Sequence, residues 1–560
     1  MQVLNQQNKS SRYFNLIAAI FLIAVFLLAL RPIADYDTGY HLATGEYIVT
    51  HRAVPLYDIF SYTALDARWI AHYWLADVIF YLVNFIAGFK GLIVFVALMA
   101  ALTYYLILKT IWLKKGKSLL PLVLLMVFAY LSMELWVVRP QIFSYLLTVL
   151  LIYILERRKK LSNNGWLYAL PLIFLVWANL HAGVVLGVAI MALYFFSEII
   201  SSRWNIKTVK TLSLAFLISS VATLINPNGY KIIIYNSIIA PAVKLMHVGE
   251  WEPLFDYLFK WQAKVFVAIL AASLAFVWYM VWKKKEDFHK RDWISLGLIT
   301  GAVIMPLISV RHVGFFPIIA LPVVSFYLTD LFEDKRISFD SIRFVVPLTF
   351  ILGIVLVLGP LIRLPKMPLI NTRQLPEGSA NFILQNNLPA PILNPQHFGG
   401  YLIWKLWPGY KVFVDGRSEV FMGTPNDDYN AILYRTNGWE KLVNEKYKIN
   451  TIILAYPDFA NLSGASTYNA VTKRLGFVAV YFDDLSVVLI RNNARDKELI
   501  DRFGYKVISP FADVKGVKKE LLSEALKEAQ RARETSLDST IVRSILEAVK
   551  IRMAQESITQ

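Results

Sequence analysis

The chain has 560 residues, of which 57% are hydrophobic and 17% are charged. This apolar share is above that of ordinary soluble domains, so the composition predicts a polytopic membrane protein. The formal net charge of +17 does not indicate nucleic-acid binding, because the Lys and Arg residues fall mostly in short loops between apolar runs. The sequence contains no cysteine, which excludes a disulfide, a thiolate nucleophile and a Cys-ligated metal.

The first apolar run covers residues 13–30 and follows Lys9 and Arg12. It ends in Leu-Ala-Leu-Arg-Pro, which contains no small-x-small cleavage site. We therefore expect a retained membrane anchor with a cytoplasmic amino terminus.

Asp35 and Asp37 follow this run and are separated only by Tyr36. Carboxylates beside hydrocarbon are costly and are usually retained for chemistry, so this pair is the first candidate catalytic site. Residues 39–51 have apolar side chains at helical spacing, which predicts an amphipathic interfacial helix with Asp37 and Thr38 at its N-cap. Capping alone is therefore the structural alternative for Asp37.

Apolar stretches that approach the 17 to 25 or so residues of a full crossing recur up to residue 362. Residues 72–88 are apolar but follow a polar loop and contain Asp77. If they crossed the membrane, the later basic clusters would face outward, so we expect this stretch to lie along the outer surface. The predicted spans, about eleven, are 13–30, 91–112, 118–136, 140–155, 166–178, 181–200, 210–226, 263–282, 293–309, 313–330 and 342–362.

Basic residues between these runs predict the cytoplasmic side. The clusters are Lys114, Lys115 and Lys117; residues 157–160; Arg203, Lys207 and Lys210; Lys283 to Lys285 with Lys290 and Arg291; and Lys335 with Arg336. The opposite, extracytoplasmic face then receives the first outer loop, the polar residues at the other helix ends, and everything after residue 362. The residues best suited to chemistry therefore share one side.

The composition changes after the membrane part, which we assign to residues 1–365 with a first outer loop at 31–90. Residues 370–495 are predicted to form a soluble, extracytoplasmic α/β domain, and residues 510–560 a helical segment with a hairpin at 515–556. The predicted strands are 391–394, 411–414, 451–455, 478–482 and 486–490, and the predicted helices are 377–387, 438–447 and 467–475.

The first outer loop combines an acidic pair, an interfacial helix, a Pro-containing extended stretch and a Trp-bearing second helix. Over residues 35–77 this arrangement resembles the GT-C superfamily of membrane glycosyltransferases, in particular protein O-mannosyltransferases and the lipid A aminoarabinose transferase. Further stretches resemble uncharacterised bacterial membrane proteins of this kind: VWANLHAGVVLG, LINPNGY, EWEPLF, RHVGFFPIIALP and GGYLIWKLWPGYKVFVDGRSE.

The resemblance implies transfer of a sugar from a polyprenyl-phosphate carrier to a lipid, glycan or protein acceptor. The reaction would take place at the extracytoplasmic face of the cytoplasmic (inner) membrane, among membrane lipids. Asp37 or Asp35 would take the acceptor proton, and Arg139 and Arg311, at predicted outer helix ends, would hold the donor phosphate.

His181 and His312 would assist the two arginines in holding the phosphate. Each of these residues also has a structural interpretation. Arg139 could extend to the interface, His181 near Asn179 could be a hydrogen-bonded packing residue, and Arg311 with His312 could anchor a helix end.

Four further residues are candidates for contact with the acceptor. Glu250 and Glu252 flank a tryptophan in an outer loop and would either complete an acidic site or face solvent. Asp415 and Arg417 end a predicted strand in a tight turn, which its own ion pair could stabilise. They would touch the acceptor if the C-terminal domain folds over the membrane site.

The spacing of Asp35 and Asp37 departs from the adjacent Asp-Glu pair usual in the resembling enzymes. No cofactor is required by the implied chemistry, but this spacing also occurs where a divalent cation, Mg²⁺ or Mn²⁺, binds a sugar phosphate. No G-x-x-x-x-G-K-[ST] loop or G-x-G-x-x-G after a strand is present, which argues against nucleotide-driven chemistry. The alternative functions are a non-catalytic transport or assembly protein and an oligosaccharide transferase on the same architecture.

Overall fold

The structure is a computed structural model that describes residues 2–115, 120–203, 209–235, 238–239, 249–284, 287–334, 339–456, 464–511 and 514–558. Five residues of the predicted basic clusters lie outside this part of the chain: Lys117, Lys207, Lys285, Lys335 and Arg336. The chain divides into two compact units. The first comprises Met1–Ile33 and Ile70–Leu369, and the second comprises Ala34–Trp69 and Ile370–Gln560.

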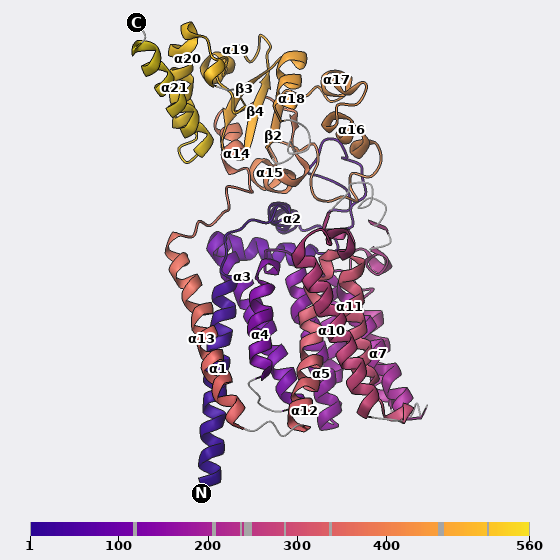
Figure 1. The fold of residues 1–560 in the computed structure, drawn as a ribbon. Helices are drawn as coiled ribbons and strands as arrows, with labels where there is room; N and C mark the ends of the chain where they lie inside the picture. The colour runs from indigo at the N-terminus through magenta and orange to yellow at the C-terminus, as the bar shows by residue number, and fades with distance from the viewer. Residues whose placement is uncertain are drawn as a thin grey trace. The chain divides into compact units, whose positions relative to one another are not determined.

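The first unit consists of apolar α-helices that run side by side (Figure 1). They are α1 (Gln2–Ala29), α3 (Trp74–Lys115), α4 (Leu120–Leu131), α5 (Gln141–Leu161), α6 (Leu170–Leu180), α7 (Val184–Ser201), α8 (Lys210–Ala222), α10 (Trp261–Lys284), α11 (Trp293–Ile308), α12 (Phe315–Asp334) and α13 (Phe339–Arg363). Helix α1 packs against α3 and α13, and α3 packs against α5. Each predicted span overlaps one of these helices.

Four helical segments are long and apolar enough to cross a membrane among the described residues: Trp74–Lys114, Val184–Ser201, Trp261–Lys284 and Phe315–Phe332. Five shorter apolar helices accompany them. Large apolar side chains such as Leu172, Trp261 and Ile362 are exposed on helices of this unit. Helices satisfy their own backbone hydrogen bonds, so such surfaces suit lipid. The chain is an integral membrane protein.

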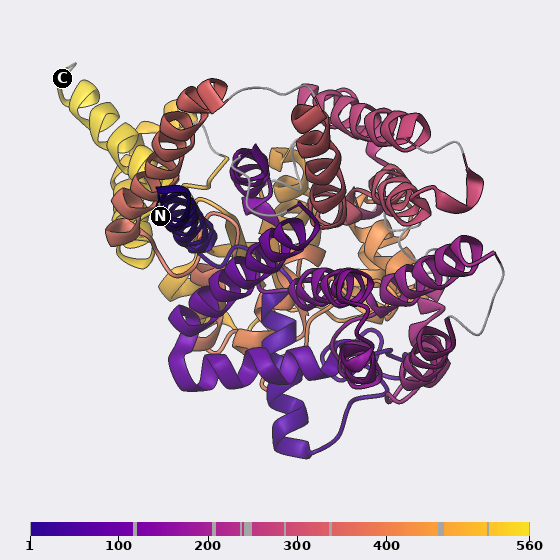
Figure 2. The same cartoon turned by 90° about the horizontal axis from the view of Figure 1, so that it is seen from below.

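Helix α3 is interrupted at Gly88, whose φ of 60° and ψ of −163° are not helical. Glycine tolerates this conformation because it has no Cβ. The part of α3 before the break runs across the long axes of the other helices of the unit (Figures 1 and 2). The stretch predicted at 72–88 is therefore a helix distinct from the span that follows it.

The second unit contains a four-stranded sheet with strand order β1-β2-β4-β3. The strands are β1 (Ile392–Leu393), β2 (Thr451–Ala455), β3 (Phe477–Phe482) and β4 (Ser486–Arg491). Strand β1 pairs parallel with β2, whereas the β2–β4 and β3–β4 pairs are antiparallel. Four of the five predicted strands are present in this sheet.

The helices of the second unit are α2 (Thr38–His51), α14 (Glu377–Gln385), α15 (Gly399–Leu406), α16 (Thr424–Leu433), α17 (Trp439–Lys441), α18 (Gly464–Asn469), α19 (Lys497–Phe503), α20 (Leu522–Thr535) and α21 (Thr540–Ile558). Helices α14, α19 and α20 pack against β3, and α20 packs against α21. The last two helices form the predicted terminal hairpin.

The predicted strand at residues 411–414 is wrong. The backbone N–H of Val412 donates to the carbonyl of Phe60 at 3.1 Å, so this segment is bridged to the first loop. The side-chain oxygen of Asn394 accepts from the Phe413 N–H at 2.8 Å. Because these partners satisfy the backbone groups, the segment needs no neighbouring strand.

Residues 34–69, which form much of the predicted first outer loop, belong to the same compact unit as the C-terminal residues. Helix α2 packs closely against α15. A Cβ on Gly39 would lie 2.2 Å from the Gly400 carbonyl oxygen, and a Cβ on Gly400 would lie 2.3 Å from that of Tyr36. Only glycine permits so close a backbone approach, so these positions fix the acidic segment against α15.

Candidate functional site

Asp35 and Asp37 lie on the turn that leads into α2. Asp35 Oδ1 accepts a hydrogen bond from the Asp37 backbone N–H at 2.9 Å, which closes the turn. Asp37 has φ and ψ of −84° and −18°, and its side chain makes no capping hydrogen bond to α2. Asp37 stands at the predicted N-cap position of α2 but makes no side-chain capping hydrogen bond there, so such a bond does not account for its carboxylate.

Two residues from the C-terminal part of the second unit lie beside this acidic pair. A Cβ on Gly416 would lie 2.4 Å from Asp37 Oδ1, so the glycine leaves the space that the carboxylate occupies. The Tyr36 ring packs edge-on against His397, with ring centroids 5.0 Å apart. Burial lowers the pKa of His397 to about 4, so its ring is neutral near pH 7. Sequence reasoning did not predict that either residue lies beside the acidic pair. The only hint in the sequence was that His397 precedes the stretch GGYLIWKL and Gly416 lies within VDGRSE, two stretches that carry the family resemblance.

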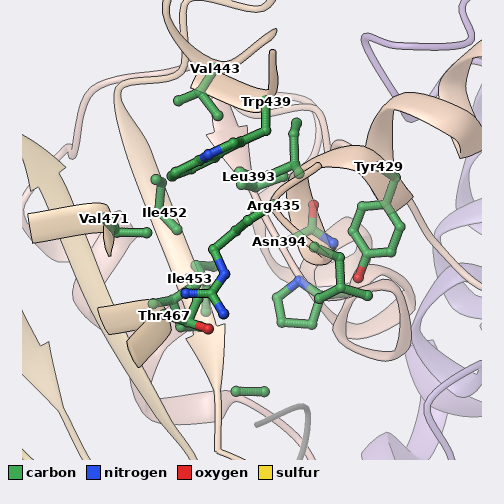
Figure 3. Close-up of a pocket in the computed structure, with 15 residues that line it drawn as sticks. Leu393, Asn394, Tyr429, Arg435, Trp439, Val443, Ile452, Ile453, Thr467 and Val471 are labelled. Atoms are coloured by element: carbon green, nitrogen blue, oxygen red, sulfur yellow. Dashed lines mark hydrogen bonds between the residues drawn. The ribbon is translucent and has the colours of Figure 1, made fainter. Parts of the chain in front are cut away.

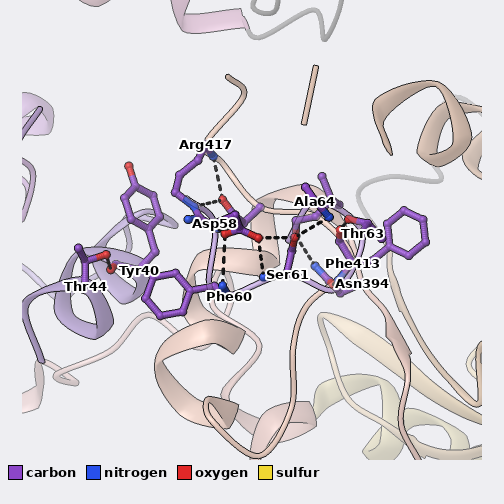
Figure 4. A network of polar contacts seen from close by, with 12 residues as sticks. Tyr40, Thr44, Asp58, Phe60, Ser61, Thr63, Ala64, Asn394, Phe413 and Arg417 are labelled. Carbon is purple, nitrogen blue, oxygen red and sulfur yellow. Dashed lines mark hydrogen bonds and ion pairs between the residues drawn. The ribbon is translucent and has the colours of Figure 1, made fainter. Parts of the chain in front are cut away.

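Arg417 is the centre of a buried ion network in the same unit (Figure 4). Its Nη2 lies 2.7 Å from Asp58 Oδ1 and 2.6 Å from Asp415 Oδ2, and its Nε donates to Asp415 Oδ1 at 2.8 Å. All three side chains are 0% exposed. The guanidinium also packs over the ring of Trp69, 4.5 Å from the ring centroid. The network joins the first loop to the turn at residues 415–417, the DGR turn.

This burial bears on the two candidates for acceptor contact in the DGR turn. Asp415 and Arg417 bind each other, as the structural alternative for this turn predicts, and their side chains do not reach the surface. Asp58, which sequence reasoning missed, also accepts from the backbone N–H groups of Phe60 and Ser61 at 3.2 and 2.9 Å. Asp58 lies in the first loop, far from Arg417 in the sequence, so the residues around it did not indicate an ion pair with Arg417.

Arg139, Arg311 and Glu250 form a charged cluster in the first unit. Arg139 Nη1 lies 2.7 Å from Glu250 Oε2, and Arg311 Nη1 lies 3.0 Å from Glu250 Oε1. Arg139 precedes α5, Arg311 lies in the short helix Val310–His312, and Glu250 lies in the short helix Gly249–Trp251. The side chains are 18%, 25% and 34% exposed, so the cluster is partly buried.

Backbone contacts tie the Glu250 segment to the Arg311 segment. Ser309 Oγ donates to the carbonyl of Glu250 at 3.1 Å, and the Val310 N–H donates to the carbonyl of Glu252 at 3.0 Å. These bonds hold the two segments together independently of the Glu250 side chain. Glu252 thus takes part through its backbone, and its side chain is half-buried.

The guanidinium of Arg311 is oriented by two more side chains. It lies over the ring of Trp251, 4.8 Å from the centroid. With the Gln141 amide oxygen turned toward it, Arg311 donates through Nε and Nη2 at 3.1 and 3.2 Å. Burial alone would raise the pKa of Glu250, but Arg311 and Arg139 outweigh it and lower the pKa to about 2. Glu250 is therefore an anion at neutral pH.

The two candidate histidines have different surroundings. His181 Nδ1 accepts from the Gly183 N–H at 3.0 Å and lies 2.8 Å from Ser144 Oγ, which accepts from the Trp177 indole at 2.8 Å. These contacts are those of the packing residue described by the structural alternative. His312 follows Arg311 directly, and burial together with that guanidinium lowers its pKa. Its ring is therefore neutral near pH 7.

A metal site and a ligand pocket are two other kinds of functional site. Within the described ranges, no group of three or more His, Asp or Glu side chains could hold a metal ion. A pocket of about 50 Å³ in the second unit is lined mainly by apolar side chains, with Arg435 as its charged group (Figure 3). Small-molecule sites usually exceed roughly 300 Å³, so this pocket is too small for a sugar or a lipid.

Neither a protein-family model nor a curated protein matches the sequence. Solved structures of similar fold include the following three. AglB, the oligosaccharyltransferase of Archaeoglobus fulgidus, in complex with an inhibitory peptide and a dolichol-phosphate, has a TM-score of 0.55 and 11% identity, covering 98% of this chain and 86% of that chain. The oligosaccharyltransferase of the same organism in complex with Zn and sulfate has a TM-score of 0.53 and 12% identity, covering 96% and 85%.

ArnT from Cupriavidus metallidurans, bound to undecaprenyl phosphate, has a TM-score of 0.50 and 11% identity, covering 86% of this chain and 98% of that chain. At these identities the similarity concerns the fold. The resemblance to GT-C proteins that the sequence predicts is confirmed at that level.

Proposed function

We propose that this integral membrane protein is a glycosyltransferase that moves a sugar from a polyprenyl-phosphate carrier to a hydroxyl group of an acceptor. The observation that carries the proposal is the convergence of Arg139 and Arg311 on the two oxygens of one carboxylate. Two guanidinium groups spaced in this way also match two oxygens of a phosphate. Support comes from the similar fold of ArnT bound to undecaprenyl phosphate and of AglB in complex with a dolichol-phosphate.

The reaction conserves atoms and charge. The acceptor oxygen attacks the anomeric carbon of the sugar, and the bond between that carbon and the phosphate oxygen breaks. The acceptor proton goes to a carboxylate, and the lipid phosphate leaves with one more negative charge than it had in the donor. Arg139 and Arg311 stabilise the developing charge, which is the kind of interaction that lowers the barrier most.

We assign the base to Asp37. One oxygen of Asp35 accepts the Asp37 N–H, so Asp35 holds the turn that presents its neighbour. No metal is needed for charge neutralisation, because the two guanidinium groups supply positive charge. The alternative is a divalent cation held by Asp35 and Asp37 with water and phosphate oxygens, a ligand set that Mg²⁺ accepts. Loss of transfer on chelation, restored by Mg²⁺ or Mn²⁺, would identify this alternative.

The proposal includes a topology and a location. About eleven spans cross the cytoplasmic (inner) membrane, the amino terminus is cytoplasmic, and the soluble part at 370–495 is an extracytoplasmic α/β domain that aids acceptor recognition. The five basic clusters of the membrane part support this orientation. The chain has no native cysteine, so the labelling of single cysteines introduced into the loops from either side of the membrane tests this orientation directly.

The deciding experiment is transfer by the full-length protein in nanodiscs, with polyprenyl-phosphate sugars as donors. Asp37→Asn should lower the rate by about 10²- to 10⁴-fold, since the amide cannot take the proton. Asp66→Asn, an exposed acid of the same loop, is the matched control and should leave the rate unchanged. Full activity of Asp37→Asn together with loss in Asp35→Asn would move the base to Asp35.

A second candidate function is transfer of a whole oligosaccharide, which the similarity to the archaeal oligosaccharyltransferase over 98% of this chain favours. The same assay distinguishes the two. A lipid-linked oligosaccharide donor that reacts while single-sugar donors do not would select it.

A further inference from the structure

The position between Arg139 and Arg311 is filled by an anion that belongs to the chain itself. Each guanidinium donates to a different oxygen of the Glu250 carboxylate, at 2.7 and 3.0 Å. A carboxylate and a phosphate present similar oxygen pairs to arginine. Glu250 therefore occupies the place that the proposed function gives to the donor phosphate.

We propose that Glu250 is an internal competitor for the phosphate of the lipid carrier: it leaves the two arginines when donor binds and returns to displace the lipid phosphate product. This inference rests on the proposed function, because it concerns the same pair of arginines. It adds that the chain itself sets how tightly the phosphate is held.

The charge change of the reaction explains why such a competitor is useful. The donor phosphate is a diester with one negative charge, whereas the released lipid phosphate is a monoester with a second ionisation near pH 6. At neutral pH the product therefore carries nearly two negative charges. Two guanidinium groups in a partly buried site bind such a product more tightly than the donor, and slow product release limits many enzymes.

The structure gives Glu250 both the tether and the freedom for this exchange. The bonds from Ser309 Oγ to the Glu250 carbonyl and from the Val310 N–H to the Glu252 carbonyl do not involve the carboxylate. The segment therefore stays beside Arg311 when the side chain turns away, and its effective concentration remains high. The Glu250 side chain is 34% exposed, which leaves it a path to solvent.

A purely structural ion pair would behave differently. If Glu250 only holds the two arginines in place, its removal would disorder them and weaken phosphate binding. If Glu250 competes, its removal leaves Arg311 supported by Trp251 and Gln141, and phosphate binding becomes stronger. The sign of the change in affinity therefore separates the two roles.

The experiment measures binding of farnesyl phosphate to the full-length protein in nanodiscs. Glu250→Gln, which keeps the size of the side chain and removes its charge, should bind about tenfold more tightly than the natural protein. Glu250→Asp should bind with an affinity between the two, because a shorter carboxylate reaches both arginines less well. Asp256→Asn, which removes the charge of an exposed acid in the same loop, is the matched control and should bind like the natural protein.

Equal or weaker binding by Glu250→Gln, with farnesyl phosphate still bound by the natural protein, overturns the competitor role and leaves the transferase proposal standing. If Glu250→Gln binds farnesyl phosphate more tightly but the natural protein transfers sugar from no lipid donor, the result supports competition for the phosphate and overturns the transferase proposal. Absence of binding in the natural protein, Glu250→Gln and Glu250→Asp alike overturns both.

Discussion

Replacing Gly416 with alanine should displace the Asp37 carboxylate while the second unit stays folded. The new Cβ would lie 2.4 Å from Asp37 Oδ1, whereas carbon–oxygen contacts are normally about 3.3 Å or longer. A gap of about 1 Å must therefore open. The atom in contact is the end of a side chain, so rotation of the carboxylate is the least costly response.

The expected magnitudes differ for rate and stability. A shift of about 1 Å in a group that must meet the reacting atoms lowers a rate by about 10²-fold, which corresponds to about 2.7 kcal/mol in the barrier. A side chain pushed off its rotamer costs only about 0.5 to 1.5 kcal/mol of folding free energy. Gly416→Ala should thus lose most of its transfer rate and little of its stability.

The assay combines sugar transfer, thermal unfolding and farnesyl phosphate binding in nanodiscs. Gly409→Ala is the matched control, because its nearest neighbour, the carbonyl oxygen of Leu406, would lie at an ordinary 3.4 Å. Farnesyl phosphate binding should be the same in both variants and in the natural protein. Gly416→Ala with an intact fold and a full transfer rate would refute the assignment of Asp37 as a closely positioned base.

Two further outcomes concern the stability of the second unit. Arg417→Met should lower the unfolding free energy of the second unit by about 3 to 5 kcal/mol, because two buried carboxylates lose their counter-ion. Hydrogen exchange at residues 56–69 and 412–420 measures the change, and adding Asp58→Asn should recover part of the lost stability. A loss under about 1 kcal/mol would contradict the role of Arg417 as a buried counter-ion. Burial lowers the pKa of His397 to about 4, so between about pH 6.5 and 4 the unfolded chain binds a proton that the folded chain does not. Stability should therefore fall by at most about 3.4 kcal/mol as the pH drops through this window. Thermal unfolding of His397→Gln should lack that decrease, and equal pH profiles for both proteins would contradict the assignment.

Local pattern was enough to predict the helices of the first unit and most strands, but it missed α15, α16 and α19 of the second unit. Apolar runs fixed the helices of the first unit, and alternation between turn residues located β2 and β4 to within a residue. The same reasoning failed at residues 411–414, whose apolar pattern reads as a strand. Their backbone partners are a loop residue, Phe60, and a side chain, Asn394, and neither is visible in a short window of sequence.

The arginine cluster was predictable and the buried network was not. Arg139 and Arg311 stood out because they lie at predicted outer helix ends, whereas the basic clusters mark the opposite side, and the acidic candidates on the same predicted face included Glu250. Asp58 and Arg417 are separated by 359 positions, and each reads by itself as a turn residue. Long-range ion pairs depend on which loops fold together, a property that one sequence does not contain.

The composition of the second unit from two distant stretches has a consequence for biosynthesis. Residues 34–69 leave the ribosome first, and residues 70–369 must be made before Gly400 and Arg417 exist. During that interval Asp58 has no counter-ion and α2 has no α15 to pack on. A fragment that begins at residue 370 would bury Arg417 with only one of its two carboxylates. The C-terminal part is therefore not a portable module, and a chimaera has to exchange both stretches together.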